Sequence, residues 1–160
     1  MITIKIESKE LDRALDSLMS SLKNTKPVME DISNLMMKDI HEHFEDEKGD
    51  ENKKWKKSIR AGMQGGKTLT DKGFLKGELF QESTNTQASI VSKTEYASIH
   101  NFGGVIRAKN KPFLRFKIGD KWSSKKEVTM PERRFMWISN KSINMIVNTI
   151  AEYIERSWRK

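Results

Sequence analysis

Cysteine is absent from the 160-residue chain, which excludes disulfide frameworks, thiolate zinc sites and cysteine nucleophiles. No apolar run approaches the ~20 residues that a membrane-spanning helix needs. The N-terminal stretch MITIKIESKELD also lacks the apolar centre of a signal peptide. We therefore expect a protein that starts in the cytoplasm and does not associate with a membrane.

A complete phosphate-binding loop is missing as well, although one stretch comes close to it. Residues 61–70, AGMQGGKTLT, contain Gly-Lys-Thr, but Ala61 stands where the loop needs its first glycine. The preceding KKWKKSIR (residues 53–60) cannot be the buried strand that such a loop follows. We interpret the stretch as a solvated Gly/Lys loop and expect no nucleotide or other cofactor.

The three histidines do not form a convincing metal or catalytic site. His41 and His43 are two residues apart and cannot share one helix face, and His41 with Glu45 lacks further ligands. We interpret this region as a solvated helix end. His100 could act as a general base, but no nucleophile with an orienting carboxylate is near it. We expect instead a packed histidine that hydrogen-bonds the turn after a short helix, and no catalytic residue.

Charge is distributed unevenly along the chain. Residues 1–52 hold 7 Lys/Arg and 13 Asp/Glu, a net charge of −6, whereas residues 53–160 hold 23 and 9, a net charge of +14. This asymmetry fits a basic surface for nucleic acid. It equally fits a subunit whose acidic end meets the basic end of a neighbour, or a need for solubility alone.

Aromatic residues interleaved with cations leave nucleic-acid binding open as an alternative. Bases stack on rings while cations meet phosphates, but core rings beside surface lysines give the same pattern. No motif of an RNA-recognition fold, a KH domain or a zinc finger is present. The aromatic residues in question are Trp55, Phe113, Phe116, Trp122, Phe135 and Trp137.

Periodicity in the first third predicts one strand and two helices. Residues 2–7 alternate apolar and polar side chains, as in a half-buried strand. After a cap at Ser8, Leu11, Leu15, Leu18 and Leu22 share a helix face. A second helix begins near Pro27 and ends at a charged loop, residues 45–54. The two helices are expected to form a hairpin or to pack on a common sheet. The apolar face of the second comprises Met29, Ile32, Leu35, Met36, Ile40 and Phe44.

The rest of the chain predicts a mixture of short elements and one long helix. Residues 67–80 suggest a turn and helix, residues 88–93 a strand, and residues 94–104 a short helix capped by Thr94 and ended by Gly103 and Gly104. Residues 112–118 and 125–130 predict a β-hairpin around a turn at 119–124. The last helix, up to residue 158, starts near Ser139 or Asn140.

This order predicts a single α+β domain, with helices packed on a mostly antiparallel sheet and a long basic β-hairpin. Within it we distinguish an N-terminal strand and helical hairpin (residues 1–46), a central core (residues 53–138) and a C-terminal helix (residues 139–158).

Three stretches of the chain form an ordered pattern: KTLTDKGFLKGEL (residues 67–79), TEYASIHNFGGVI (94–106) and VTMPERRFMWIS (128–139). Together they resemble the phage virion morphogenesis family, which includes the Mu-type G proteins and tail-completion proteins. The related minor tail or neck proteins of long-tailed phages carry a similar pattern. Lys72, Glu78 and Arg134 depart from the family pattern, as in a divergent member. The matching residues are Leu69, Asp71, Gly73, Leu75, Tyr96, Ala97, His100, Phe102, Gly103, Pro131, Arg133 and Phe135.

The resemblance implies a structural protein without catalytic activity, which completes the tail or joins tail to head. It would be made in the host bacterial cytoplasm and become part of the virion. It would bind phage neck or tail proteins and copies of itself in a ring, and be a monomer or weak oligomer alone. The motif residues are expected to be structural, with Gly73, Gly103 and Pro131 at turns and with Tyr96 and His100 locking the short helix. A basic nucleic-acid-binding module remains the alternative.

The basic hairpin, residues 105–130, is the expected docking element. Only Asp120 and Glu127 offset its cations, so a self-satisfied surface is excluded. The hairpin is either a solvated arm or docks on an acidic surface of a neighbouring copy or another neck or tail protein, or on DNA. Its cations are Arg107, Lys109, Lys111, Arg115, Lys117, Lys121, Lys125 and Lys126.

Overall fold

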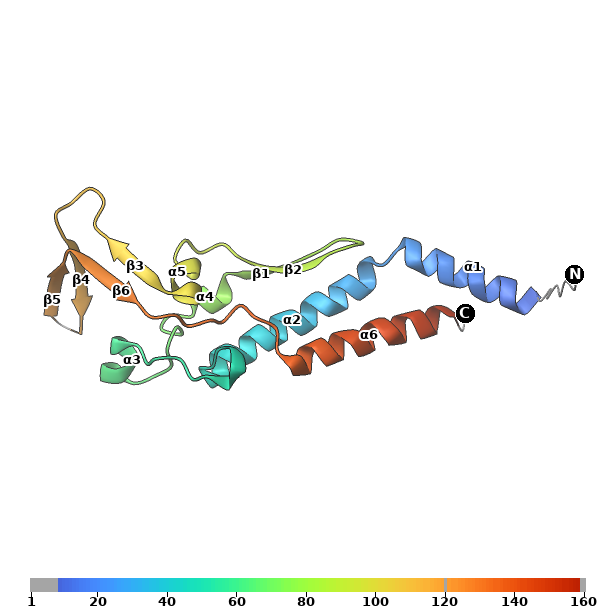
Figure 1. Ribbon diagram of the computed structural model, residues 1–160, viewed down its shortest axis with the longest axis horizontal. Helices are drawn as coiled ribbons and strands as arrows, with labels where there is room; N and C mark the ends of the chain where they lie inside the picture. Colours follow the sequence, from blue (N-terminus) through green and yellow to red (C-terminus); the bar gives the residue numbers. More distant parts are fainter. Residues whose placement is uncertain (1–8, 120, 159–160) are drawn as a thin grey trace, which may run out of the picture. The chain divides into compact units, whose positions relative to one another are not determined.

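The computed structural model describes residues 9–119 and 121–158 (Figure 1). It contains helices and antiparallel strand pairs, which confirms the α+β class. The strands form three separate two-stranded sheets rather than one larger sheet. The predicted strand at residues 2–7 and the cap at Ser8 lie outside the described residues.

The chain divides into two compact units. Unit 1 comprises Met1–Met36, Gln81–Ser89 and Asn140–Lys160, and unit 2 comprises Met37–Phe80 and Ile90–Ser139. The division of a single domain into three segments, expected from the sequence, stays a prediction. None of the described helices combines the length and the apolar composition that a bilayer crossing requires.

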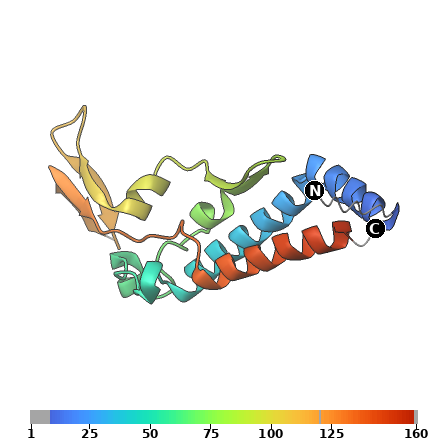
Figure 2. The same cartoon turned by 45° about the vertical axis from the view of Figure 1, so that its right-hand side comes forward.

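Unit 1 is built on long helices that the apolar spacing predicted. They are α1 (Lys9–Lys23), the first part of α2 (Lys26–Asp46) and α6 (Asn140–Trp158). The main helix partner of α1 is α6, not α2 as in the expected hairpin, and the two lie side by side in Figure 2. The Tyr153 hydroxyl makes hydrogen bonds of 2.9 Å to the carbonyl of Ser21 and 2.8 Å to that of Asn24, where α1 ends.

The pair β1 (Leu79–Ser83) and β2 (Ala88–Ser92) forms a two-stranded sheet. A 2.8 Å hydrogen bond from Thr84 N to the Gln87 carbonyl closes the turn between them. The Gln81 amide donates to Ser33 O and to Asn34 Oδ1, which ties β1 to α2. The strand β2 was predicted, but β1 was not, and its first two residues were wrongly included in the preceding turn-and-helix segment. The sequence LFQES carries no alternation that marks a strand.

Unit 2 has its apolar core around the second part of α2. The Phe44 ring packs 5.1 Å from the Phe135 ring and, edge-on, 5.7 Å from the Trp55 ring. Removing these side chains from water supplies the main stabilisation of the unit. The helices α4 (Phe74–Gly77) and α5 (Ala97–Phe102) each place one buried side chain in this core. The buried cluster consists of Ile40, Phe44, Trp55, Leu75, Leu79, Ala97 and Phe135.

Two local features between α2 and α4 differ from the sequence prediction. The helix α2 continues through Asp46, so the charged loop begins later than residue 45 and includes the short 3₁₀ turn η1 (Asp50–Asn52). A short helix, α3 (Ile59–Gln64), was not predicted. The Ser58 hydroxyl caps it by accepting a hydrogen bond from Ala61 N.

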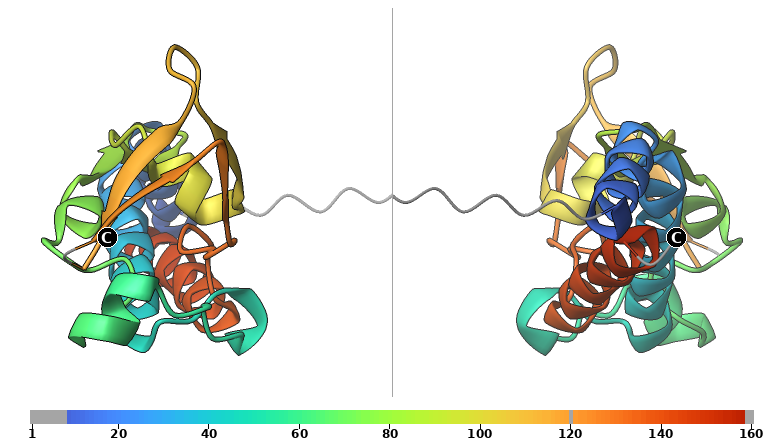
Figure 3. Two further views of the ribbon diagram at one scale, coloured as in Figure 1. Left: turned by 90° about the vertical axis from the view of Figure 1, so that its left-hand side faces the viewer. Right: turned by 90° about the vertical axis from the view of Figure 1, so that its right-hand side faces the viewer.

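The basic hairpin has a different strand pairing from the predicted one. The strand β3 (Gly104–Arg107) pairs with β6 (Glu127–Met130), and β4 (Leu114–Ile118) pairs with β5 (Lys121–Lys125). The predicted turn at residues 119–124 was too long, because the ladder already closes at Ile118 and Lys121. The two pairs are separate two-stranded sheets, and the chain between β3 and β4 projects as a loop (Figure 3).

The helix α5 ends at Gly103, as predicted, and two separate features of the structure require glycine at this position. Its φ of +69° is in the left-handed region, which side chains disfavour. A Cβ at this position would lie 2.8 Å from Glu132 N and 3.0 Å from the Met130 carbonyl. The predicted side-chain cap at Thr94 is wrong, since Tyr96 is the N-cap. Ala97 N donates to the Thr94 carbonyl, and the Thr94 hydroxyl contacts the Ser92 hydroxyl instead of the helix.

Replacing Gly103 by alanine should therefore destabilise the protein by more than about 1 kcal/mol, since strain and a backbone clash add. Thermal unfolding followed by circular dichroism measures this effect. Gly77→Ala is the matched control, because a Cβ there meets nothing within 4 Å. Equal melting temperatures for the two variants would contradict the close approach at Gly103.

Candidate functional site

The three motif stretches converge in unit 2 although they lie on separate elements. Residues 69–75 lead into α4, residues 96–103 form α5 and its end, and residues 131–139 follow β6 mostly without regular secondary structure. Leu75, Ala97 and Phe135 meet in the apolar core. The other motif residues, except Phe102 and Gly103, line a single cavity.

The segment that follows β6 is held by side chains instead of a strand ladder. The Asn101 side-chain oxygen accepts hydrogen bonds from Phe135 N at 3.0 Å and from Met136 N at 2.9 Å. His43 Nδ1 lies 3.0 Å from the Phe135 carbonyl, to which it donates. Asn101 and His43 are both buried. Buried backbone groups need such partners, so these polar residues fix the path of the segment.

The last residue of this segment, Ser139, is held in the same way. The Asp39 carboxylate accepts 2.7 Å hydrogen bonds from the backbone N and the hydroxyl of Ser139. The Trp137 ring stacks on the His43 ring with centroids 4.3 Å apart. The interpretation of residues 41–47 as a solvated helix end was therefore wrong for His43, which is buried and packs on this segment.

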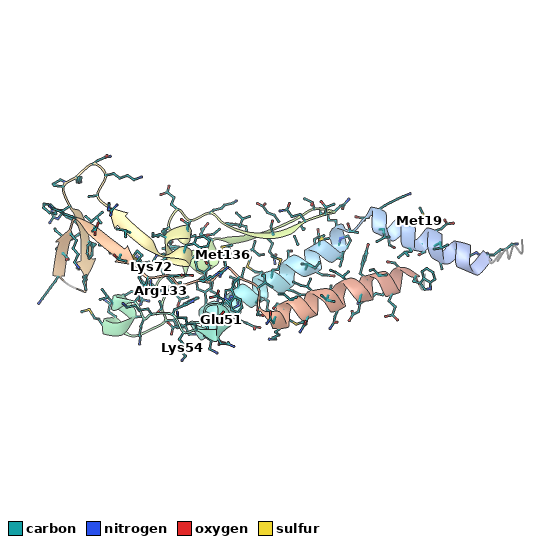
Figure 4. All side chains as sticks on the ribbon, viewed as in Figure 1. Met19, Glu51, Lys54, Lys72, Arg133 and Met136 are labelled. Atoms are coloured by element: carbon teal, nitrogen blue, oxygen red, sulfur yellow. The ribbon has the colours of Figure 1, made fainter. Side chains whose placement is uncertain are left out.

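The cavity has a volume of about 580 Å³. Arg133 and His100 lie on it, and Arg133 is only 4% exposed. Arg133 Nε donates to the Lys56 carbonyl at 2.8 Å, and Arg133 N donates to the His100 carbonyl at 2.9 Å. Figure 4 labels Arg133 together with Lys72, another residue of the cavity lining.

His100 does not make the side-chain hydrogen bond that we expected. Its carbonyl makes the contact to the neighbouring segment, while its Nδ1 is buried and has no hydrogen-bond partner among the described residues. Burial, and in addition the charge of Arg133, lower the pKa of His100. The Tyr96 ring stands edge-on to the His100 ring at 5.9 Å, so these two side chains pack together.

The remaining motif residues mark turns and surface. Gly73, with a φ of +78°, is the N-cap of α4, in agreement with its prediction as turn punctuation. The Asp71 carboxylate lies 3.6 Å from Arg60 Nη1. Phe102 is exposed and is not part of the core. Sequence reasoning missed Asp39, His43, Trp55 and Asn101 as anchors, since none of them belongs to a periodic pattern.

The eight predicted docking cations are all exposed, on or beside the strands of the hairpin. Arg107 faces Glu127 across β3 and β6 and pairs with it at 3.0 Å. On β4, Arg115 faces Ser124 and Lys117 faces Trp122, so the register places no two cations directly opposite each other. The arrangement avoids the repulsion of directly opposed like charges. The remaining cations are Lys109, Lys111, Lys121, Lys125 and Lys126.

The Gly-Lys-Thr stretch is tied to the acidic end of α2 and follows a helix instead of a strand. Lys67 pairs with Glu45, and Thr68 N donates to Glu47 Oε1 at 2.5 Å. Thr68 is fully buried, so the interpretation as a solvated loop was wrong for this residue.

The ion pairs of Glu45 lead to a pH-dependent prediction. Hydrogen bonds from Lys67 and Lys76 lower the pKa of Glu45 from 4.5 to about 2. The pairs therefore stabilise the fold fully above pH 4.5, and this contribution is lost as the pH falls towards 2. Replacing both lysines by alanine should bring the Glu45 pKa back towards 4.5 in an NMR titration of the side-chain carboxyl. An unchanged pKa would contradict these pairs, and Lys54→Ala is the control.

Comparison with known proteins gives one match. The sequence model of the phage virion morphogenesis family matches residues 6–155, which is nearly the whole chain and includes all three motif stretches. No curated protein and no solved structure matches significantly. The matched range includes the residues that build the core and the cavity of unit 2, and the chain belongs to the phage virion morphogenesis family.

Proposed function

We propose that this protein completes the tail or joins tail to head during virion assembly, and that it acts through protein–protein contacts in a ring. Family membership over residues 6–155 supports a structural role in phage assembly and favours such a role over catalysis. The position in the virion and the ring contacts are our proposal. Alone, the protein is expected to be a monomer or a weak oligomer.

The observation that carries the proposal is the inverted burial of α6. Small polar side chains, Ser142 and Ser157, are buried on this helix, whereas five of its large apolar side chains are exposed and Met145 and Ile146 are half-buried. These apolar side chains follow one another at intervals of three or four residues and form a stripe, which we call the α6 stripe. Its members are Ile143, Val147, Ile150, Ile154 and Trp158, between 38% and 58% exposed.

The helix α1, which packs on α6, adds a second apolar surface. Leu15, Met19 and Leu22 are 42%, 59% and 53% exposed, and Met19 is labelled in Figure 4. A ring needs two different surfaces on each subunit that fit each other. Contiguous exposed apolar surface of this kind is typical of protein contact sites. The exposed faces of α1 and α6 are therefore our candidates for the contact between copies.

The basic hairpin supports a second contact, with an acidic surface of a neck or tail protein. Its eight cations are exposed, and Arg115 lies 5.6 Å from the ring of Trp122, which is itself 67% exposed. Exposed Arg and Trp are enriched at the centres of protein interfaces.

Glutamate at Val147 and Ile154 should leave the fold intact and prevent the formation of infectious particles. Both side chains are exposed, so the melting temperature should change little, while a charged residue in the α6 stripe blocks apolar contact. Plaque complementation with a phage that lacks the gene measures the effect. Asn148→Glu, an exposed change outside the stripe, is the control. Full infectivity of the folded double variant would contradict the role of the stripe.

Reversal of charge at Arg115, Lys117 and Lys125 should likewise give a folded protein that fails in complementation. The variant loses charge complementarity but few buried contacts. Lys23, Lys53 and Lys54, which are exposed outside the hairpin, serve as the matched triple reversal. If the hairpin variant supports normal plaque formation, the docking role is wrong. If it fails and the wild type binds duplex DNA with a steep salt dependence, the nucleic-acid alternative replaces protein docking.

A further inference from the structure

Arg133 is a buried cation for which the described residues supply no anionic partner. The residue is 4% exposed, and among residues 9–119 and 121–158 the one hydrogen-bond acceptor of its guanidinium is the Lys56 carbonyl, which binds Nε. In the described part of the chain no carboxylate pairs with its guanidinium, since Asp71, the carboxylate on the cavity lining, pairs with Arg60. Burying a charge in this way is unfavourable unless it is paired, and burial already lowers the Arg133 pKa.

A second unsatisfied polar atom lies in the same cavity. His100 Nδ1 is buried and has no hydrogen-bond partner within residues 9–119 and 121–158. His100 and Arg133 are joined through their backbones at 2.9 Å. The lining therefore combines one buried ring nitrogen without a partner, which is rare in a protein interior, with guanidinium nitrogens that can still donate hydrogen bonds.

The rest of the lining defines what can enter. Lys56, Lys57 and Lys72 also line the cavity and add positive charge. Together with Arg60 and Arg133, the lining contains five Lys/Arg residues and one carboxylate, Asp71. Apolar side chains complete the wall, and a volume of about 580 Å³ is within the range of binding cavities. The wall residues are Leu69, Phe74, Tyr96, Met130 and Pro131.

We propose that this cavity binds a carboxylate-bearing peptide segment of a partner protein. The carboxylate pairs with the terminal nitrogens of the Arg133 guanidinium, whose fork matches the geometry of such an anion. An apolar side chain next to it in the peptide packs on the Phe74 and Tyr96 wall, while Lys72 attracts further acidic residues. The proposal names a partner chemistry for assembly and so rests on the proposed function.

A protein segment fits the cavity better than a nucleic acid. Phosphates of duplex DNA lie on a continuous backbone and are met by exposed cations. A guanidinium that is 4% exposed is reached by a group that can enter a cavity, such as an Asp or Glu side chain or a terminal carboxylate. The apolar wall also has no counterpart in a phosphate backbone.

The test is peptide binding to the purified full-length protein, followed by fluorescence anisotropy. The probe is a labelled, C-terminally amidated pentapeptide, Asp-Phe-Glu-Leu-Asp, and its Asn/Gln analogue is the uncharged control. We expect binding of the acidic probe and none of the analogue. Arg133→Lys, which keeps the charge and loses the fork, and Lys72→Glu should each weaken binding about tenfold or more. Lys54→Glu, an exposed reversal outside the cavity, should change it less than about twofold.

A second readout separates a binding role from a structural role of Arg133. A carboxylate held beside His100 should raise the pKa of its imidazole in an NMR titration of the wild type, because a nearby negative charge favours the protonated form. A merely structural Arg133 gives no such change on addition of the peptide. If Arg133→Lys does not fold, Lys72→Glu and the His100 titration decide the question.

Several outcomes would overturn the proposal. These are no binding of the acidic probe to the wild type at millimolar concentration, an equal loss in Lys54→Glu, or equal binding of the uncharged analogue. Displacement of the probe by an equal concentration of inorganic phosphate would indicate a small-anion site instead. Binding of a duplex DNA probe that Lys72→Glu abolishes, without peptide binding, would indicate nucleic acid. Because the assay uses purified protein, its failure leaves the complementation results on the assembly role untouched.

Discussion

The Asn101 side chain is the contact on which much of unit 2 depends. Its oxygen binds two consecutive backbone N–H groups, those of Phe135 and Met136, in a segment that has no strand ladder to satisfy them. Loss of this acceptor would leave one buried and one partly buried donor unpaired, and an unpaired buried donor has a desolvation penalty of about 1–3 kcal/mol. The fully buried Phe135 ring can fill the core only because its backbone is held in this way. An apolar core therefore depends on a polar side chain.

The same segment also creates the cavity. Since Arg133 precedes Phe135 by two residues, fixing Phe135 in the core places Arg133 beside His100. Gly103 makes the arrangement possible, because its missing Cβ lets residues 130–132 approach the end of α5. The packing of Phe135 in the core and the position of the Arg133 charge on the cavity therefore both follow from the path of residues 130–136. The guanidinium stays on the cavity because Phe135 and Arg133 belong to the same short, irregular stretch.

Whether the sequence predicts a feature of this structure depends on how far apart along the chain the interacting residues are. Helical spacing in α2 and α6, the strand-like stretch at residues 88–93 and the glycine end of α5 are local signals, and they predicted these elements correctly. The pairing of β3 with β6 and the anchors Asp39, His43 and Asn101 join residues far apart in the chain, which local patterns do not encode. Of the cavity lining, the family resemblance identified Tyr96, His100 and Arg133 as motif residues. That they line one cavity, where Arg133 is buried and His100 Nδ1 has no described hydrogen-bond partner, could be seen only in the coordinates.

The two units leave different interactions unsatisfied, and these respond differently to solution conditions. Covering the α6 stripe would be driven by the hydrophobic effect, which has no preferred direction and depends little on moderate salt. Pairing of the buried Arg133 guanidinium demands one geometry and excludes partners that lack an anion there. The hairpin cations are exposed and screened within about 10 Å at 0.1 M salt, so in the proposed docking they would affect mainly the rate of encounter. In assembly, apolar contact would thus supply affinity, the hairpin would speed approach, and the cavity would select the partner.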